Sequence, residues 1–404
     1  MSKSTKNKEN NKIMITLQNA ESALKTVYLG AVTDLLNTKT NPLLAKIEQT
    51  SQDVWGKEIR KAARFGINGG IGAGTETGEL PQANANNYLQ FVATLKNLYG
   101  QIEISDKAIR ASSDERGAFT DLLNAELEGL LEASKFNLGR MLYGDGTGLL
   151  TGIQADFSSH FGIQGAMVAD SPQNLVEGLV VDAFAPNGTS RGTWRIGNVD
   201  RDTGRVQFAG QDPNMMFPSG VTYFYVQGSR DKEITGIAAL FDTARDIYGL
   251  SRAEHPGLVP HTDTPNAMSE IVIQKAIDRL ETHAGSTVDF IAVSADVKYE
   301  YQEFLSTFKR NVDVMELEGG YRTLAYNGIP VVYDRFVPNK TMYLLNTKSL
   351  KIHQLCDWRY LETENGNILR QTQGRPTFSA TLVKYCDLIC DRPNGQARLT
   401  GFGL

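Results

Sequence analysis

A stretch without a helix breaker, from Ser113 to Tyr143, constrains the fold of this chain more than any other feature of its sequence. It contains no proline, and Ser112 with Glu115 has the spacing of a capping box, in which side chains bind unpaired amides of the first turn. Gly144-Asp145-Gly146 supplies a stop, because glycine tolerates the left-handed conformation past a helix end. At 3.6 residues per turn one apolar stripe forms, consisting of Phe119, Leu123, Leu127, Leu130, Leu131, Leu138, Met141 and Leu142. A helix of about 30 residues is roughly 45 Å long, far longer than the ~11–12 residue mean, which indicates a structural element.

A glycine-rich segment precedes this helix. Residues 65–81 read FGINGGIGAGTETGELP, and so much glycine does not fold a core by itself, since each glycine loses much backbone entropy on ordering. Two strand-like runs follow it, at 87–95 and 98–105, both rich in aromatic and aliphatic residues. A glycine-rich tip between strand-forming flanks indicates an arm that projects from the body of the protein. A flexible surface loop is the alternative interpretation of the same residues.

Composition narrows the class of protein. A length of 404 residues predicts two or three packed units, and 41% hydrophobic with 22% charged residues is ordinary for a soluble globular chain. The formal net charge of -5 excludes a strongly cationic nucleic-acid binder, so any contact with DNA is expected to be local or absent. We find no apolar run of ~18–20 residues and no secretory leader, and therefore expect no membrane span. The three cysteines are expected to be free thiols.

The sequence pattern of the region between 152 and 230 is typical of a separate β module. Short strands are predicted at 178–184, 192–199, 205–208 and 221–226, with a tight hairpin turn at Asp200–Gly204. Such strands could close a small barrel that folds by itself.

The remaining segments mix helices and strands. Amphipathic helical pieces are expected at 24–36 and 43–59, a helix opening at Asp263–Pro265, and a further helix at 295–308. Strands are expected at 289–293, 331–334, 342–345, 350–352 and 378–390.

Catalytic and metal-binding patterns are weak. Gly188-Thr189-Ser190-Arg191-Gly192 matches the G-x-S-x-G pattern of serine hydrolases, but that elbow needs a helix after the serine, and here a strand is predicted. Asp200 and Asp202 resemble the start of a calcium loop that lacks its twelfth-position glutamate. The five histidines are scattered without metal-ligand spacing. No catalytic, cofactor-binding or metal-ligating residue is predicted.

Taken in order along the chain, these features resemble the major capsid proteins of tailed bacteriophages, whose fold is shared with encapsulins and the floor of herpesvirus capsids. An N-terminal arm comes first, followed by an extended loop from about Lys61 to Ser105, in which residues 98–105 are similar to the returning strand. The long helix with its ending Met141–Gly146 is similar to the spine helix. Gly328–Asp334 with Met342–Leu345 is similar to the strand pair before the chain returns to the peripheral domain.

The resemblance implies an α+β capsid fold with six parts. These are an N-terminal arm (1–58), an extended loop (59–105), a peripheral domain with the spine helix (106–151), an inserted small β-barrel (152–230), an axial domain (231–348) and a return to the peripheral domain (349–404). It further implies a structural protein of the virion capsid that assembles with itself, as hexamers and pentamers, into an icosahedral shell in the host bacterial cytoplasm. Expected partners are scaffolding, portal and maturation-protease proteins. Packaged double-stranded DNA would be contacted only weakly and non-specifically, with no membrane and no cofactor.

Seven apolar residues are candidates for contacts between subunits. Five lie on the arm, and two lie on a second flank of the long helix, outside its main stripe: Phe65, Ile67, Ile71, Leu80 and Tyr88, then Leu122 and Phe136. Two alternatives stay open, an encapsulin-like compartment shell and a serine hydrolase that uses Ser190.

Overall fold

The computed structural model describes residues 41–107, 116–155, 167–209, 221–265, 267–307, 314–317, 321–362, 366 and 368–402. The chain divides into two compact units, whose described parts are Tyr99–Ser134 with Trp358–Val383, and residues 41–98 with Lys135–Asp357 and 384–402. The long helix α4 (Arg116–Tyr143) and the strands β5 (Lys96–Ser105), β18 (Leu350–Tyr360) and β20 (Thr377–Cys390) each run from one unit into the other.

Helix α4 confirms the predicted long helix from Arg116 onward, whereas its expected cap at Ser112 and Glu115 lies outside the described residues. It ends at Tyr143, and the amide of Gly144 donates to the carbonyl of Met141 (3.0 Å). The predicted stripe is buried wherever its side chains are described, except that Leu130 is half-buried. In the smaller unit β5 passes so close to α4 that a Cβ at Gly100 would lie 2.8 Å from Leu130 Cδ1.

A five-stranded sheet has the order β1-β18-β20-β19, with β5 also paired to β20. Strand β1 (Glu48–Thr50) runs parallel to β18, and β19 (Arg370–Gln371) runs antiparallel to β20. Strand β20 confirms the long C-terminal strand, and Cys386 and Cys390 on it are buried free thiols.

The second sheet lies in the larger unit and is covered on both faces. Its order is β12-β21-β17-β13-β16-β15-β14, with bounds β12 His261–Asp263, β21 Ala397–Thr400, β17 Thr341–Leu345, β13 Phe290–Val293, β16 Ile329–Tyr333, β15 Tyr321–Tyr326 and β14 Val314–Leu317. Helices α6 (Glu270–Ala284) and α7 (Ala295–Thr307) pack on the face that carries Met342 and Leu344. On the alternate positions of β17, Tyr343 contacts the rings of Tyr143 and Phe241. Every residue of β13 and β17 is consequently buried, as expected of strands covered on both faces.

The predicted β module is a closed six-stranded barrel of order β10-β7-β6-β11-β8-β9. Its strands are β6 Leu149–Ala155, β7 Met167–Ala169, β8 Val180–Phe184, β9 Ser190–Asp200, β10 Arg205–Phe208 and β11 Val221–Val226. Strand β8 alternates half-buried and buried residues, so that Val181 and Ala183 point into the apolar interior. The hairpin turn between β9 and β10 is confirmed, because Asp200 Oδ1 accepts the amides of Asp202 and Thr203.

The chain enters and leaves the barrel at neighbouring points. The amide of Asp231 donates to the carbonyl of Thr147 (2.8 Å), and Gly148, with φ +79°, lies against Ser229 and Glu233. Glu233 is buried and forms an ion pair with Arg140, which lies in the last turn of α4. An insertion whose two ends meet in this way leaves the flanking segments continuous.

Two sequence predictions were wrong. The helix expected over 43–59 is only the short α2 (Pro42–Lys46), followed by β1, β2 (Val54–Trp55) and the start of β3 (Glu58–Phe65). This segment forms strands because turn residues at 51–53, with a left-handed backbone at Asp53 (φ 62°), interrupt any helix, and because β1 pairs with β18. The helix expected from Asp263–Pro265 begins instead at Glu270 with Ser269 as its cap, because Asp263 ends β12, which pairs with β21. The piece expected at 24–36 lies outside the described residues.

The end of α4 docks against helix α5 (Ile237–Phe241) at a point where only glycine fits. A Cβ on Gly236, the residue before α5, would lie 2.3 Å from the carbonyl oxygen of Met141 and 2.5 Å from that of Gly144. Because both oxygens belong to the backbone, the contact cannot be relieved by a side-chain rotation.

We expect Gly236→Ala to destabilise the protein by about 3 kcal/mol or more, the upper range for overpacking. The matched control is Gly129→Ala on the exposed face of α4, where an added Cβ meets nothing within 4 Å. This control should stabilise the protein by about 0.5–1 kcal/mol, since alanine favours a helix over glycine. Urea denaturation followed by circular dichroism measures both, and equal midpoints for the two variants would contradict the packing described.

Candidate assembly surface

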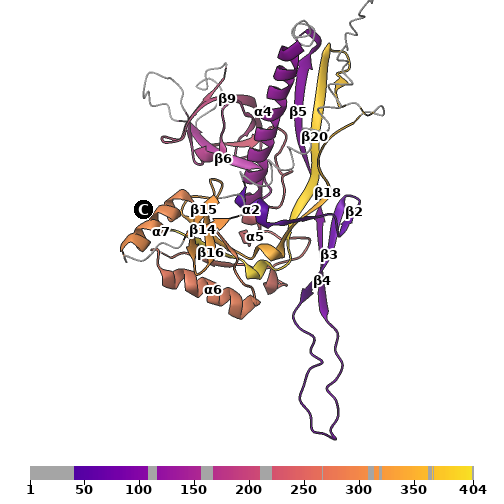
Figure 1. The fold of residues 1–404 in the computed structure, drawn as a ribbon, viewed down its shortest axis with the longest axis vertical. Coiled ribbons are helices and arrows are strands. Elements are labelled where there is room, and N and C mark those ends of the chain that lie inside the picture. Colours follow the sequence, from indigo (N-terminus) through magenta and orange to yellow (C-terminus); the bar gives the residue numbers. More distant parts are fainter. Residues whose placement is uncertain are drawn as a thin grey trace, which may run out of the picture. The chain divides into compact units, whose positions relative to one another are not determined.

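The arm is a two-stranded antiparallel ribbon with a long loop. Strands β3 and β4 (Asn87–Thr94) pair residue for residue, from Glu58 with Thr94 to Phe65 with Asn87, and β2 adds a short third strand. Figure 1 shows β3 and β4 side by side, opening into the loop of residues 66–86. The strand predicted at 87–95 is confirmed as β4, and its pairing with β3 makes the arm a hairpin.

Only one face of the paired strands is buried. Ile59, Ala63 and Phe91 point to the buried face, with 1%, 9% and 2% of their surface exposed. The alternate positions on both strands, from Arg60 to Arg64 and from Tyr88 to Thr94, are exposed. The arm is therefore packed along one side of its base, and the described residues leave its other side uncovered.

The glycines of the loop lie where its two legs approach each other. A Cβ on Gly70 would lie 3.1 Å from the amide nitrogen of Asn84, and one on Gly72 would lie 3.0 Å from the ring of Pro81. The amide of Gly78 donates to the carbonyl of Thr75 (3.1 Å), which closes a turn at the far end. The loop is thus a narrow continuation of the ribbon, and glycine permits this close approach of the two legs.

Exposed large apolar side chains concentrate on this ribbon. Ile67 and Ile71 are each 75% exposed, Leu80 is 89% exposed and Tyr88 is 61% exposed. The structure adds Trp55 at 71%, which sequence reasoning missed because it lies in a segment expected to be helical. Apolar groups gathered on one element mark an interaction surface more strongly than scattered ones do.

Of the other three candidates, Phe65 lies on the ribbon, whereas Leu122 and Phe136 lie on α4. Phe65 ends β3 and Leu122 lies in α4, but their side chains are outside the described parts. Phe136 is half-buried and packs edge to face on Phe336 of its own chain, at 5.1 Å between ring centroids, with the Arg335 guanidinium 5.0 Å from its ring. A role for these residues between subunits stays a prediction.

Tyr248 clamps the base of the ribbon. Its ring lies 5.2 Å from that of Phe91, and its carbonyl accepts the amide of Val92 (3.0 Å). Its hydroxyl accepts the amide of Cys390 (2.9 Å) and donates to the carbonyl of Leu388 (3.4 Å), both on β20. Burial raises the pKa of Tyr248 well above its usual range, so the hydroxyl keeps the proton it donates.

The backbone at Tyr248 is held in an uncommon conformation. Its φ is 52°, followed by 75° at Gly249, in a turn closed by two hydrogen bonds between Ile247 and Leu250. Left-handed geometry is costly for a bulky residue and persists only where the surroundings enforce it. The contacts of Tyr248 with the ribbon and with β20 supply that enforcement.

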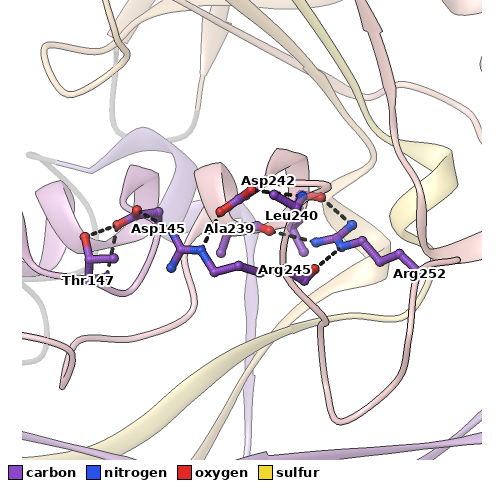
Figure 2. A network of polar contacts seen from close by, with 8 residues as sticks. Asp145, Thr147, Ala239, Leu240, Asp242, Arg245 and Arg252 are labelled. Atoms are coloured by element: carbon purple, nitrogen blue, oxygen red, sulfur yellow. Dashed lines mark hydrogen bonds and ion pairs between the residues drawn. The ribbon is translucent and has the colours of Figure 1, made fainter.

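A polar network fixes the loop that carries Tyr248 (Figure 2). Arg245 bridges Asp242 (2.6 Å) and Asp145 (3.0 Å), the latter just past the end of α4. Burial opposes ionisation of Asp145, but hydrogen bonds from Thr147 and the contact with Arg245 outweigh it and lower the pKa of that carboxyl. Arg252 donates to the carbonyls of Ala239, Leu240, Arg245 and Leu258, which ties both ends of the loop to α5. The clamp is thereby connected to the C-terminal end of α4.

A second anchor joins the inner face of the ribbon to the C-terminal segment. The Lys61 ammonium lies 2.7 Å from the Asp391 carboxylate, and both side chains are mostly buried. These residues are 330 positions apart in the sequence, so no local pattern indicates the pair.

Ser190 stands in a β-hairpin and not in a strand-to-helix elbow. It begins β9, the turn before it places Gly188 at φ 84°, and the serine Oγ accepts the amide of Gly192 (3.3 Å). The prediction that a strand follows Ser190 is confirmed. Among the described residues, no group of three or more His, Cys, Asp or Glu has the arrangement of a metal site, and no helix is long and apolar enough to cross a membrane.

We expect Tyr248→Ala to loosen the base of the ribbon, because it removes both the ring contact with Phe91 and the hydroxyl bridge to β20. The loss should be about 3–5 kcal/mol, as for other buried aromatic truncations, and Tyr248→Phe, which loses only the hydroxyl, should cost about 1–2 kcal/mol. Hydrogen exchange followed by mass spectrometry measures this as faster exchange at 58–65 and 87–94. Peptides from α6 serve as the internal control, and unchanged protection of the ribbon in Tyr248→Ala would contradict the clamp.

No protein-family model and no curated protein sequence matches the chain. Solved structures do match it. The capsid asymmetric unit of cyanophage A-1(L) aligns with a TM-score of 0.54 and 14% identity, covering 90% of this chain and 93% of that chain. The SrpI encapsulin of Synechococcus elongatus PCC 7942 aligns with a TM-score of 0.47 and 11% identity, over 92% of this chain and 95% of that one. The capsid of a native GTA particle aligns with a TM-score of 0.46 and 10% identity, over 90% and 91%.

The match to the cyanophage capsid, with its TM-score of 0.54, covers nine tenths of this chain. The fold predicted from the order of sequence features is therefore confirmed: this chain has the major capsid protein fold of tailed bacteriophages, with an inserted small β-barrel.

Proposed function

We propose that this chain is the major capsid protein of a tailed bacteriophage, a structural subunit that assembles with itself into the icosahedral head shell around the genome. The observation that carries the proposal is the ribbon, which leaves Ile67, Ile71 and Leu80 at least 75% exposed on its own chain. Each such side chain contributes about 1.5–3 kcal/mol when it is fully buried. A second copy of the chain supplies the missing cover.

The fold supports this function because a shell subunit needs an element that reaches beyond its own core. The ribbon is anchored at its base by Tyr248 and by the Lys61–Asp391 pair, while its loop has no core of its own. A firm base with an uncovered tip is suited to bridging from one subunit to the next. Within the shell we propose hexamers and pentamers of this chain.

The six-part division fits the elements as a proposal. We propose that the extended loop (59–105) holds the ribbon and β5 and that the peripheral domain (106–151) holds α4. The barrel strands run from Leu149 to Val226, so the barrel begins slightly before the proposed boundary of 152–230. Most of the seven-stranded sheet lies in the axial domain (231–348), and β18, β20 and β21 belong to the return segment (349–404). We propose that the barrel adds contacts on the outside of the shell or between neighbouring capsomers.

The same proposal implies where the shell assembles, with which partners, and how it contacts DNA. Subunits would assemble in the bacterial cytoplasm with scaffolding, portal and maturation-protease partners and reside in the virion capsid. A net charge of -5 favours a wall that contacts packaged DNA only weakly, because strong binding requires many cationic contacts to phosphates.

Shortening the ribbon tests the proposal. Phe65 and Asn87 are paired, so replacing residues 66–86 by Asn-Gly creates a two-residue hairpin turn compatible with the strands. We expect a folded subunit with an unchanged circular dichroism spectrum and a loss of closed shells in sedimentation and negative-stain microscopy.

A second variant keeps the full length of the ribbon and tests the contribution of its apolar side chains separately from the contribution of its length. In Ile67→Ser/Ile71→Ser/Leu80→Ser the ribbon keeps its length, and the yield of shells should fall at least tenfold, since a loss of ~1.4 kcal/mol already corresponds to a factor of ten. Normal shells from the shortened variant would show that the ribbon is an ordinary surface loop.

A further inference from the structure

A cationic cavity lies at the base of the ribbon. Its volume is about 310 Å³, and its charged lining consists of four cations, Lys61, Arg64, Lys348 and Arg392, with one carboxylate, Asp391. Lys61 is paired with Asp391, and Arg392 donates to the carbonyls of Ala284 and Gly285 at the end of α6. Arg64 and Lys348 are exposed and have no ion-pair partner among the described residues. The cavity therefore presents unneutralised positive charge.

The far end of the ribbon carries the opposite charge. Glu76 and Glu79 are the only charged residues between positions 65 and 95. Glu76 lies within the turn closed by the Gly78 amide and the Thr75 carbonyl, and Glu79 follows that turn. Both side chains are exposed, and neither has an ion-pair partner among the described residues. The tip thus offers two carboxylates to an external partner.

The tip cannot reach the cavity of its own chain while the ribbon keeps its form. Arg64 and Glu76 are 12 positions apart, which corresponds to roughly 40 Å along an extended leg at ~3.3 Å per residue. The close approaches of Gly70 to Asn84 and of Gly72 to Pro81 hold the two legs together, so the tip points away from the base. The carboxylates of a tip that enters this cavity therefore belong to another copy of the chain.

We propose that the cavity at the base of the ribbon receives the acidic tip, Thr75–Glu79, of a second copy of this chain. The carboxylates of Glu76 and Glu79 meet the cations of Arg64 and Lys348, and Leu80 lies beside them. This inference rests on the proposed function, because it specifies which surface of one shell subunit the ribbon of another contacts. Each copy carries both halves of the contact, so it repeats from subunit to subunit.

Disulfide trapping between two single variants tests the pairing. Glu76→Cys and Lys348→Cys are purified separately, mixed, assembled and oxidised, and heterodimers are counted on non-reducing gels. Lys275→Cys, an exposed position on α6, replaces Lys348→Cys in the matched control, and the unmodified chain reports the background from Cys356. We expect at least tenfold more heterodimer with Lys348→Cys than with Lys275→Cys. Equal yields in shells that otherwise form normally would overturn the inference and leave the proposed function standing.

Charge reversal gives an independent readout. Glu76→Lys/Glu79→Lys should reduce shell yield at low salt, and adding Arg64→Glu/Lys348→Glu to the same chain should restore it, with circular dichroism verifying the fold of each variant. Failure of the unmodified chain to form shells at all would instead count against the proposed function. Binding of a short DNA duplex that is lost in Arg64→Glu/Lys348→Glu, together with an absence of trapped heterodimers, would assign the cavity to phosphate and overturn the proposal.

Discussion

One-sided burial of the ribbon is the constraint on which the rest of this structure depends. Ile59, Ala63 and Phe91 bury the inner face of β3 and β4, and Lys61 adds an ion pair with Asp391. In the part of the chain that the structure describes, the outer face and the loop stay exposed and carry large apolar side chains, namely Trp55, Ile67, Ile71, Leu80 and Tyr88. Such a ribbon is stable only at its base when it is alone, so its apolar groups favour association with other molecules.

The base is held by residues brought together from distant parts of the chain. Tyr248 contacts the ribbon through Phe91 and Val92 and contacts β20 through its hydroxyl. Arg245 and Arg252 fix the loop that carries Tyr248, and Asp145 joins this loop to the end of the long helix. The direction of the ribbon is thus coupled to the end of α4 through a few polar contacts. In a shell, these contacts would decide how firmly the ribbon is held relative to the helix.

The sequence predicted most of the fold because local signals dominated in those regions. The breaker-free run before Gly144, the turn at Asp200–Gly204 and the β-rich run at 378–390 each became the expected element. The prediction for the segment 43–59 was wrong because its apolar spacing fits a helix. The segment forms strands because β1 pairs with β18, some 300 residues away in the sequence. The glycines of the tip, which were expected not to fold a core by themselves, permit two legs of a ribbon to pass closely.

The candidate surface was predictable only in part. Ile67, Ile71, Leu80 and Tyr88 were found because they stand in a polar, glycine-rich context where an apolar side chain has no local partner. Trp55 was not predicted as an exposed residue, because its segment was expected to be helical. Three further features were not predictable: the packing of Phe136 on Phe336, the Lys61–Asp391 pair and the clamp by Tyr248. They join residues that are 140 to 330 positions apart, and the clamp also depends on a left-handed backbone. Neither a distant contact nor a left-handed backbone leaves a pattern in the local sequence.

Electron cryo-microscopy of the purified chain, concentrated under assembly conditions, observes where the ribbon lies after assembly. We expect closed shells of uniform diameter in which residues 66–86 of each subunit lie on a neighbouring subunit and Ile67, Ile71 and Leu80 are covered. A chain that stays monomeric at these concentrations, with amide exchange in 66–86 as fast as in an unstructured peptide, would contradict it.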